Sequence, residues 1–471
     1  MKLFNSLTRR LEDFEPNAAV AKIYSCGPTV YDFAHIGNLR AFIFADTLRR
    51  VVEASGYQVR QVINITDVGH LASDGDEGQD KLETGAVREG KTVWEVAEQY
   101  TKAFLADVKA LNILPPNGYK GSPDGYARAT HFIDTQVAIV KLLLDKGYGY
   151  QTEQAIYFDV TKLKDYGKLT GQKLTDKEVA ARREVVEDSH KKHPYDFAVW
   201  FFTVGRFKDH VMHWDTPWGS GFPGWHLECS AIIHETLGEP IDIHTGGVDH
   251  IGTHHTNEIA QTEAAFGQEL AHFWLHNEFV LVDGIKMSKS LGNFYTLKDI
   301  TDKGFDPLAF RLLVLSAHYR SPLNFTWQSL EGAGQSLGNF YQWADLQFQA
   351  QTSEALKSNY LAAQTAFQRE LGNDLNTPKA LAILNSMITS VDQLGADSEA
   401  ITEAIVLIEK AFGLNLDKRR DVAADQRELL TQRQAARNQQ DWKTADKLRE
   451  SLKQAGLTVR DTEQGQLWSR D

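Results

Sequence analysis

The amino-acid sequence predicts an α/β protein in which a parallel sheet is split by an insertion and followed by a helical C-terminal half. Three observations support this prediction. Strand-like and helical runs alternate over residues 21–113, which is typical of a parallel sheet. Strand-like runs return after about Pro223, beyond a segment of different texture. From residue 336 onward, apolar residues recur at helical spacing almost to the last residue.

Length and composition are those of a globular protein in water. The 471 residues should form two to four domains, and 42% of them are hydrophobic and 24% charged. No apolar run approaches the ~18 residues that a membrane helix requires, and residues 1–16 lack the apolar core of a signal peptide. We therefore expect a cytoplasmic protein that does not bind membranes. The net charge of −13 argues against nonspecific nucleic-acid binding as the main activity.

The first predicted strand leads into a helix through a short polar motif. Ala21–Ser25 is an apolar run, and Leu39–Val52 carries apolar residues at helical spacing. The tetrapeptide His35-Ile-Gly-Asn38 between them would lie at the helix N-terminus, where free N–H groups and the helix dipole favour anions. Gly37 permits close approach of a ligand, while His35 and Asn38 can donate to phosphate oxygens. A helix cap alone would explain the same residues.

The insertion follows the next elements of the sheet. Tyr57–Thr66 is the second predicted strand, and Val93–Leu111 is a predicted helix. Residues 116–222 then contain a helical stretch, Ala127–Lys146, a strand pair near residues 150–160, and a polar, lysine-rich segment. We interpret this segment as an insertion because the α/β pattern resumes at Pro240–His244 and again at Phe279–Val282.

A second charged loop follows the last of these strands. The run Glu278–Val282 and the turn Asp283-Gly284 precede the pentapeptide Lys286-Met-Ser-Lys-Ser290. The ammonium groups of Lys286 and Lys289 can stabilise charge on a transferring phosphoryl group. We expect both motifs at the carboxyl edge of one Rossmann-type sheet, where open α/β folds bind ligands. A solvated basic loop is the simpler explanation of the pentapeptide.

The C-terminal part is predicted to be a helical bundle followed by a small module. Helical periodicity covers residues 336–371, 377–393, 397–412 and 423–455, before a short strand-like run at Leu457–Val459. Residues 433–460 carry seven Lys/Arg against three Asp/Glu in an acidic chain. A local nucleic-acid surface and a solvated helix face explain this excess about equally well.

The two cysteines of the chain are candidates for a metal site. Cys26 follows the first strand and Cys229 lies about 200 residues later, so a disulfide is not expected. If Thr253 caps a helix, His254 and Glu258 share one helix face, and the four side chains would fit tetrahedral zinc. Two buried cysteines beside an ordinary helix pair remain an alternative. Four other histidines compete as ligands: His226, His244, His250 and His255.

Eight stretches spread nearly end to end match the motifs of one family. They are Cys26-Gly-Pro-Thr-Val-Tyr-Asp32 with His35–Asn38, Asn64-Ile-Thr-Asp67, Pro223-Gly-Trp-His-Leu-Glu-Cys-Ser230, Asp242-Ile-His-Thr-Gly-Gly247, His254-His-Thr-Asn-Glu258, Lys286–Asn293, Asn373–Pro378 and Asp441–Asp446. With these motifs the chain resembles a bacterial cysteinyl-tRNA synthetase of class I. The resemblance implies a Rossmann-type catalytic domain and an anticodon-binding terminus.

The resemblance also implies a role for each motif. It assigns one zinc ion per chain to Cys26, Cys229, His254 and Glu258. It assigns ATP binding to His35, Gly37, Asn38, Asp249, Lys286 and Lys289, with His35, Asn38, Lys286 and Lys289 as catalytic residues. It assigns substrate binding to Cys26, Gly27, Thr29, Thr66, Trp225 and His244. Asn38 departs from the general class I pattern, which often has a second histidine, but its amide can still donate.

The implied reaction joins L-cysteine to tRNA(Cys) with ATP and Mg²⁺. A cysteine carboxylate is already ionised and needs no general base to attack the α-phosphorus. The cysteinyl group would pass to the 2′-OH of the terminal adenosine. Zinc would select the thiolate over the harder hydroxyl of serine, so an editing domain would be unnecessary. A monomer is expected.

Combining the resemblance with the composition changes gives six predicted segments. Residues 1–115 and 223–296 are the two halves of the Rossmann catalytic domain, the second with the lysine loop. Residues 116–222 are an inserted connective domain, 297–345 a stem-contact region, 346–416 a helical bundle and 417–471 an anticodon-binding module. In that module, an aromatic and basic surface could hold the anticodon loop, although the tryptophans could equally pack its core. The surface would comprise Trp442, Trp468, Arg433, Arg437, Arg449 and Arg460.

Two other functions stay open at this point. A cysteine ligase of the mycothiol pathway would share the zinc and adenylation motifs, but would lack an anticodon-binding terminus such as residues 417–471. A catalytically silent nucleic-acid-binding paralogue would have no chemical need for His35, Lys286 and Lys289.

Overall fold

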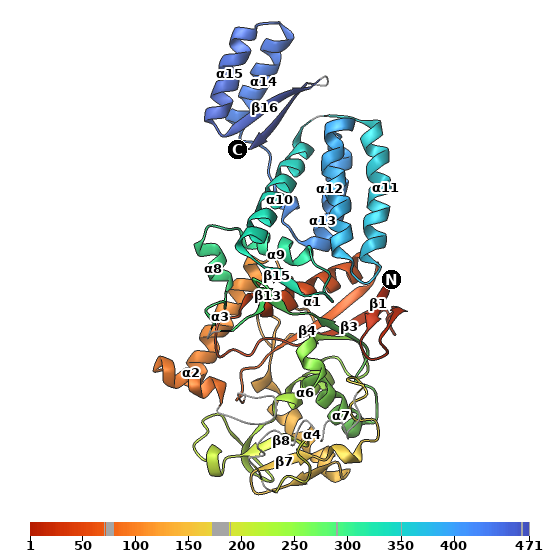
Figure 1. The fold of residues 1–471 in the computed structure, drawn as a ribbon, viewed down its shortest axis with the longest axis vertical. Helices are drawn as coiled ribbons and strands as arrows, with labels where there is room; N and C mark the ends of the chain where they lie inside the picture. Colours follow the sequence, from red (N-terminus) through yellow and green to blue (C-terminus); the bar gives the residue numbers. More distant parts are fainter. Residues whose placement is uncertain are drawn as a thin grey trace. The chain divides into compact units, whose positions relative to one another are not determined.

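The described part of the chain divides into two units. The computed structural model describes residues 1–69, 71, 80–171, 188, 190–288, 291–349, 351–462 and 465–470. The N-terminal unit comprises Met1–Lys303 with Tyr319–Phe325, and the C-terminal unit comprises Gly304–His318 with Thr326–Asp471. Figure 1 colours both units along the sequence. The six segment boundaries predicted from the sequence stay predictions.

A five-stranded parallel sheet forms the centre of the N-terminal unit, with strand order β12-β11-β3-β4-β5. The strands are β3 Val20–Ser25, β4 Gln58–Ile65, β5 Ala127–Arg128, β11 Ile241–Gly247 and β12 Ala271–Asn277. All four neighbouring pairs are parallel, which confirms the predicted fold class. Periodicity did not reveal β12, because its histidines and terminal asparagine interrupt the apolar run.

Helices connect these strands and pack on the sheet. Their bounds are α1 Ile36–Ala54, α2 Lys81–Glu89, α3 Val93–Ala110, α6 Trp225–Thr236, α7 His254–Phe266 and α8 Leu297–Asp302. The predicted strands and helices at the start of the chain are confirmed, since α1 follows β3 and contacts both β4 and β11 (Figure 1). A short hairpin, β1 Lys2–Asn5 with β2 Arg10–Asp13, precedes them.

The inserted segment forms an antiparallel sheet that shares a core with the parallel one. Its strands are β6 Gly149–Gln151, β7 Ala155–Phe158, β8 Phe197–Phe202, β9 Trp214–Thr216 and β10 Gly219–Pro223. One cluster of buried side chains contains Tyr24 and Val62 of the parallel sheet together with Phe158 and Trp200 of the insertion. The helix predicted over Ala127–Lys146 is wrong at its start: α4 covers Ile133–Asp145, because Ala127–Arg128 pairs with β4 as β5.

The lysine loop belongs to a separate sheet with order β14-β13-β15. Its strands are β13 Val280–Val282, β14 Ile285–Lys286 and β15 Leu323–Phe325. Asp283 and Gly284 have φ angles of 51° and 77°, which suit a two-residue hairpin turn. The prediction is therefore wrong in placing the strand before this loop in the main sheet, but the downstream motif still meets the helix that follows β3, as expected, since His35 forms a bridge with Thr296. The main sheet ends at β12, and Lys286 lies in a strand of the smaller sheet.

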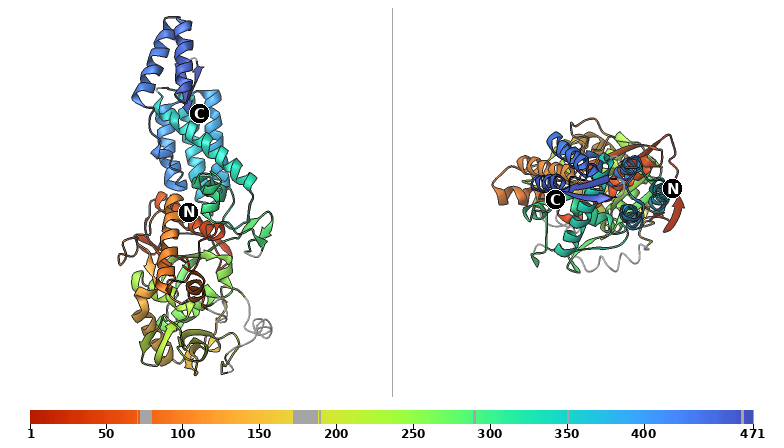
Figure 2. Two further views of the ribbon diagram at one scale, coloured as in Figure 1. Left: turned by 90° about the vertical axis from the view of Figure 1, so that its left-hand side faces the viewer. Right: turned by 90° about the horizontal axis from the view of Figure 1, so that it is seen from above.

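The C-terminal unit is a helical bundle followed by a small α/β module, as predicted. The bundle contains α9 Pro307–Leu315, α10 Trp327–Asp345, α11 Glu354–Leu371, α12 Thr377–Leu394 and α13 Ser398–Phe412. Figures 1 and 2 show α11, α12 and α13 side by side. The module contains α14 Ala424–Asn438, α15 Trp442–Gln454, β16 Leu457–Thr462 and β17 Gly465–Arg470.

Two of the periodic segments predicted here are each two helices rather than one. The segment 336–371 is interrupted between α10 and α11, and 423–455 is interrupted at Gln440, whose φ is 59°. Among the described residues, no helix combines the length and the apolar character needed to cross a membrane.

Candidate functional site

His35 and Asn38 close a reciprocal capping box at the start of α1. The Nδ1 atom of His35 accepts a hydrogen bond from the N–H of Asn38 at 3.1 Å, and the Oδ1 atom of Asn38 accepts one from the N–H of His35 at 3.2 Å. An accepting Nδ1 places the proton of the neutral ring on Nε2. The cap therefore fixes both side chains at the helix N-terminus, with an Nε2–H that can donate to an anion.

The downstream motif lies against this helix start. The N–H of Ile36 donates to the carbonyl of Tyr295 at 2.9 Å, and the ring of Phe294 packs edge-on against His35 with centroids 4.9 Å apart. A Cβ atom on Gly37 would lie 2.6 Å from the Cε atom of Met287, so the methionine side chain packs directly over this glycine. The two motifs, which are far apart in the sequence, thus meet.

Of the two predicted lysines, the structure describes one. The ammonium group of Lys286 lies 5.5 Å from the centroid of the Phe279 ring. Asn293 holds the adjoining backbone, since its Oδ1 accepts from the N–H of Ser288 at 2.8 Å and its Nδ2 donates to the carbonyl of Lys286 at 3.3 Å. Lys289 and Ser290 lie outside the described residues.

The four predicted metal ligands meet in one cluster. One donor atom each from Cys26, Cys229, His254 and Glu258 lies within 4.8 Å of all the others. Cys26 directly follows β3, Cys229 lies on α6, and His254 and Glu258 are one turn apart on α7. Thr253 is the N-cap residue of α7, as predicted, although its side chain makes no capping hydrogen bond. Their role as zinc ligands stays a prediction.

A second possible ligand set overlaps the first. Cys26, His244, His255 and Glu258 also lie within 4.8 Å of one another. In this set the Nε2 atom of His244 is 2.8 Å from Glu258, and the Nε2 atom of His255 is 3.2 Å from the sulfur of Cys26. His255 is already bound on its other side, where its Nδ1 is 2.8 Å from His276. The set with two thiols suits zinc better, and His244 and His255 would orient its ligands.

Burial and mutual charge control the ionisation of the two cysteines. Burial, together with the hydrogen bond to Cys229, raises the pKa of the Cys26 thiol well above its usual value. Burial also opposes ionisation of Cys229, but the hydrogen bond from Cys26 and the charge of His254 lower the pKa of Cys229 to about 6. One thiolate is therefore favoured at neutral pH even before a cation binds.

The buried side chains of Glu258 and His254 carry the other charges of the cluster. Burial would raise the pKa of Glu258, but His244 and His254 together hold the pKa of this carboxyl well below its usual range. Burial would lower the pKa of His254, but the charge of Glu258 raises the pKa of His254 to about 10. A dication could replace the proton on this imidazole and balance the two anions, so the donor set fits zinc.

The predicted substrate residues come from several elements around the cluster: Thr66 directly follows β4, Trp225 begins α6 and His244 lies within β11. The hydroxyl of Thr66 donates to Glu228 at 2.8 Å and accepts from Asn64 at 3.2 Å. The ring of Trp225 stacks on His254 with centroids 4.1 Å apart. Glu228 and Asn64 were missed by the sequence analysis, because only their position within the family motifs could have marked them.

The loop after β3 is held close to the end of β4. The N–H of Gly27 donates to the Oδ1 atom of Asn64 at 2.6 Å, and a Cβ atom on Gly27 would lie 1.6 Å from the Asn64 carbonyl oxygen. Thr29 forms an isolated parallel bridge with Thr66. Asp249 is exposed on the 3₁₀ turn Val248–Ile251, which follows β11. The close approach of the Asn64 carbonyl oxygen therefore requires glycine at position 27.

Arg40 joins α1 to the backbone that flanks the smaller sheet. Its side chain is 1% exposed and donates to the carbonyls of Phe279 at 2.7 Å, Tyr319 at 3.4 Å and Ser321 at 2.5 Å. Burial lowers the pKa of Arg40 to about 10, which leaves it protonated at neutral pH. Helical periodicity could not reveal this residue, since an arginine on a helix is more often exposed.

Comparison with known proteins agrees with this arrangement. The model of the class I (C) tRNA synthetase catalytic domain matches residues 14–335, and the model of the cysteinyl-tRNA ligase anticodon binding domain matches residues 419–468. The chain is 42% identical to cysteine–tRNA ligase 1 of Burkholderia lata, over 99% of this chain and 96% of that protein. The chain belongs to the cysteine–tRNA ligase family. It is thus a class I aminoacyl-tRNA synthetase, as the resemblance implied.

Other relatives extend the comparison. The chain is 39% identical to the cysteine–tRNA ligase of Treponema denticola, over 100% of this chain and 99% of that protein. Among solved structures, methionyl-tRNA synthetase of Mycobacterium tuberculosis in complex with methionyl-adenylate aligns with a TM-score of 0.62. That alignment covers 85% of this chain and 92% of that one at 14% identity, so it supports the fold alone.

Two variants should separate the overlapping ligand sets. Cys229→Ala should lose tight zinc binding, because it removes a thiolate from the favoured set. His255→Ala should keep one zinc per chain with affinity lowered about 10- to 100-fold, as for loss of an orienting partner. Metal analysis after dialysis against a graded chelator checks both. Full zinc in Cys229→Ala together with none in His255→Ala would assign the metal to the second set.

Arg40→Met should destabilise the N-terminal unit by about 3 kcal/mol or more, because it leaves buried carbonyls without their charged donor. Cysteine-dependent ATP–pyrophosphate exchange per folded molecule should also fall, since the lysine hairpin loses its tie to α1. Arg49→Met is the matched control: Arg49 lies on the same helix but donates to the Pro115 carbonyl and pairs with Glu53. Denaturant unfolding and exchange rates test both variants, and an equal fall in exchange would refute the positioning role.

Proposed function

We propose that the chain activates L-cysteine with ATP to form cysteinyl-adenylate and transfers the cysteinyl group to the 2′-OH of the terminal adenosine of tRNA(Cys). The observation that carries the proposal is the cluster of Cys26, Cys229, His254 and Glu258 in the same unit as the paired phosphate motifs. Cys26 and His35 both follow β3, so the thiol chemistry and the anion site share one strand end. We further propose that the enzyme acts as a monomer.

Adenylation would depend on positioning and charge rather than on a general base. The substrate carboxylate is ionised at neutral pH, attacks the α-phosphorus and displaces pyrophosphate. His35 and Asn38 would donate to phosphate oxygens at the N-terminus of α1, with Gly37 and Asp249 completing the ATP contacts. Lys286 and Lys289 would stabilise charge on the departing pyrophosphate, together with the Mg²⁺ that accompanies ATP.

Selection of cysteine would come from zinc held by Cys26, Cys229, His254 and Glu258. A bound zinc ion stabilises a thiolate far better than an alkoxide, so it can distinguish cysteine from serine. No hydrolytic editing site would then be needed, and the inserted sheet would be architectural. Gly27 and Thr29, on the loop that follows Cys26, would help to form the substrate site with His244. Release of serine from seryl-tRNA by this chain would contradict the proposal.

Thr66 would orient the substrate through its remaining lone pair. A hydroxyl group has one donor and two acceptor positions. Thr66 uses its donor on Glu228 and one acceptor position on Asn64. The acceptor position that is left suits the ammonium group of cysteine, while Trp225, stacked on His254, would cover the site.

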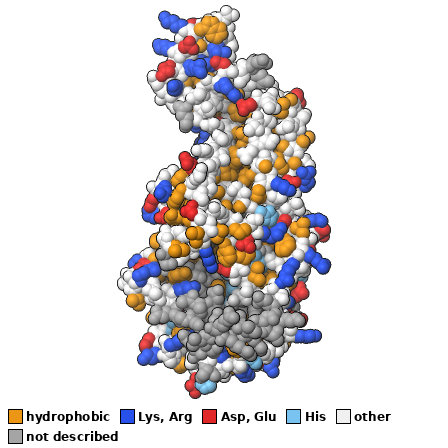
Figure 3. All heavy atoms as spheres, in the orientation of Figure 1, with side chains coloured by type: hydrophobic (Ala, Val, Ile, Leu, Met, Phe, Trp, Pro, Cys, Tyr) orange, Lys and Arg blue, Asp and Glu red, His pale blue; other side chains and the backbone are white. Residues whose placement is uncertain are grey.

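The aromatic and basic residues of the terminal module have divided roles. Trp468 is 4% exposed and Trp442 is 55% exposed. Arg433 is buried and pairs with Asp461 at 2.8 Å, whereas the guanidinium of Arg437 lies 5.6 Å from the centroid of Trp442. Lys and Arg side chains are scattered over the face of this module seen in Figure 3, with Asp and Glu side chains between them. The predicted surface is therefore wrong for Trp468 and Arg433, which are buried. Trp442, Arg449 and Arg460 are its exposed residues, and the half-buried Arg437 lies beside Trp442.

Two alternative functions fit less well. The anticodon-binding match at residues 419–468 disfavours a mycothiol-pathway ligase. The assembled capping box and metal cluster disfavour a catalytically silent paralogue, because such a protein has no need to keep them.

Trp442→Ala should weaken tRNA binding about 5- to 150-fold, because stacking of one base on an aromatic ring contributes ~1–3 kcal/mol. Its cysteine-dependent ATP–pyrophosphate exchange should be unchanged. Trp468→Ala is the contrasting variant and should lower the thermal unfolding temperature instead. Titration of tRNA in aminoacylation assays checks the first, and unchanged tRNA affinity in a folded Trp442→Ala protein would exclude the stacking role.

The main test is cysteine-dependent aminoacylation of tRNA(Cys) with and without a zinc chelator. The untreated enzyme should form cysteinyl-tRNA, and removal of zinc should reduce discrimination against serine along with the rate. Readdition of zinc should restore both. Absence of ATP–pyrophosphate exchange in the zinc-loaded protein would favour the silent paralogue, whereas exchange without any transfer to tRNA would favour a different acceptor.

A further inference from the structure

A basic cavity lies where the helical bundle meets the terminal module of the C-terminal unit. Its volume is about 340 Å³. The loop that links α13 to α14, the last strand β17 and one turn of α10 provide its lining: Tyr341, Asn415, Lys418, Arg419, Arg420 and Arg470. Four of these six side chains carry a positive charge, in a chain whose net charge is −13.

The buried carboxylate of Asp345 forms ion pairs with two of the four cations, Arg419 and Arg470. Asp345 is 0% exposed and accepts hydrogen bonds from Nε and Nη2 of Arg419 at 2.8 and 2.5 Å. The Nη1 atom of Arg470 lies 2.5 Å from the same carboxylate. Arg470 also donates to the carbonyl of Arg420 at 2.5 Å, which fixes the loop backbone. Arg419 and Arg470 thus shape the cavity, and a single negative charge is shared between them.

The other two cations are exposed and poorly compensated. Lys418 contacts the carboxylate of its neighbour Asp417 at 3.1 Å, and both side chains are exposed. Arg420 is exposed and forms no ion pair with any residue that the structure describes. Lys418 and Arg420 can therefore turn toward a ligand without breaking a buried interaction. Such exposed ion pairs contribute little to stability.

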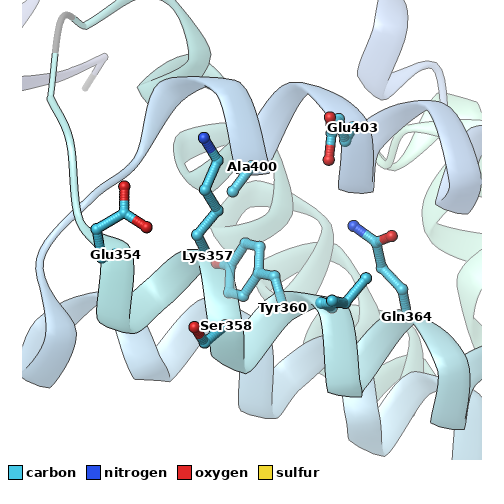
Figure 4. A pocket seen from close by; sticks show the side chains of 8 residues that line it. Glu354, Lys357, Ser358, Tyr360, Gln364, Ala400 and Glu403 are labelled. Carbon is cyan, nitrogen blue, oxygen red and sulfur yellow. The ribbon is translucent and has the colours of Figure 1, made fainter.

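A second cavity of the C-terminal unit lacks this excess of positive charge. This second cavity, of about 290 Å³, lies between α11 and α13 and is lined by Glu354, Glu403 and Lys357 among others (Figure 4). There the carboxylates outnumber the ammonium group, and Lys357 pairs with Glu399 at 2.6 Å. That cavity has no electrostatic preference for anions, so it serves as an internal comparison.

We propose that the cavity at Lys418 and Arg420 binds a backbone phosphate group of tRNA. Guanidinium groups in a concave, partly rigid arrangement recognise phosphate through charge and paired N–H donors. The site borders residues 419–468, which match the anticodon-binding domain, so an RNA held by that module is the anion within reach. Phosphate contacts of this kind fix the register of RNA without reading its sequence. The inference rests on the proposed aminoacylation of tRNA.

The test compares two double variants that remove the same charge. Lys418→Ala with Arg420→Ala removes the two exposed cations of the cavity. Lys357→Ala with Lys410→Ala removes a half-exposed lysine of α11 and an exposed lysine of α13. Direct binding of tRNA(Cys) is measured by fluorescence anisotropy at several salt concentrations. The tRNA-independent ATP–pyrophosphate exchange and the thermal unfolding temperature are measured on the same proteins.

The cavity variant should bind tRNA about tenfold more weakly or worse, and the slope of log affinity against log salt should fall by about 1 for each lost phosphate contact. Its exchange activity and unfolding temperature should match those of the wild type, and the control variant should retain wild-type affinity. Equal affinity and slope in the cavity variant, or an equal loss in the control, would overturn the proposal. Binding of inorganic phosphate that requires Lys418 and Arg420 while tRNA affinity is unchanged would assign the cavity to free phosphate instead. Loss of exchange in the wild type would refute the proposed function, and the binding measurement would still stand.

Discussion

Parallel pairing of β3 with β11 is the constraint on which the candidate site depends. The register sets Tyr24 opposite His244 and Ser25 opposite Thr245, and the N–H of Cys26 donates to the carbonyl of Thr245 at 3.1 Å. This register places the thiol of Cys26 beside His254 and Glu258, which follow β11 in the sequence. A slip of one residue would turn each side chain of the strand to the opposite face.

The cluster that results is electrostatically demanding. Burying ionised groups costs free energy unless each is paired. In this cluster Glu258 lies beside His244 and His254, and the sulfur of Cys229 lies beside His254. Removal of one member would leave a buried charge without its partner. The same balance explains why so many imidazoles gather here: neutral rings of His255 and His276, whose pKa values burial lowers, accept and donate hydrogen bonds without adding charge.

Local sequence patterns predicted the helices and strands whose apolar residues recur regularly. They did not predict which strands pair with one another. Helical spacing identified α1 because its apolar positions are regular, and motif resemblance identified the metal cluster. The hairpin that carries Lys286 was assigned to the wrong sheet, because strand partners are not encoded in a local run of residues. The sequence also could not predict which tryptophan is exposed. The structure buries Trp468 because it packs against β16 and α14, whereas Trp442 stays exposed. Arg40 was missed because its three carbonyl acceptors come from distant loops.

Sharing one hydrophobic core between the parallel sheet and the insertion sets the order in which the N-terminal unit can fold during synthesis. Tyr24 and Val62 are made early, but Ile241 of the same cluster is made 217 residues after Tyr24. Synthesis proceeds at about 5–20 residues per second, so β3 would remain without its neighbour β11 for on the order of 10 s or more. During that interval an unpaired strand edge and the Cys26 thiol would both be exposed, so the nascent chain would be open to aggregation and to oxidation before its cluster closes.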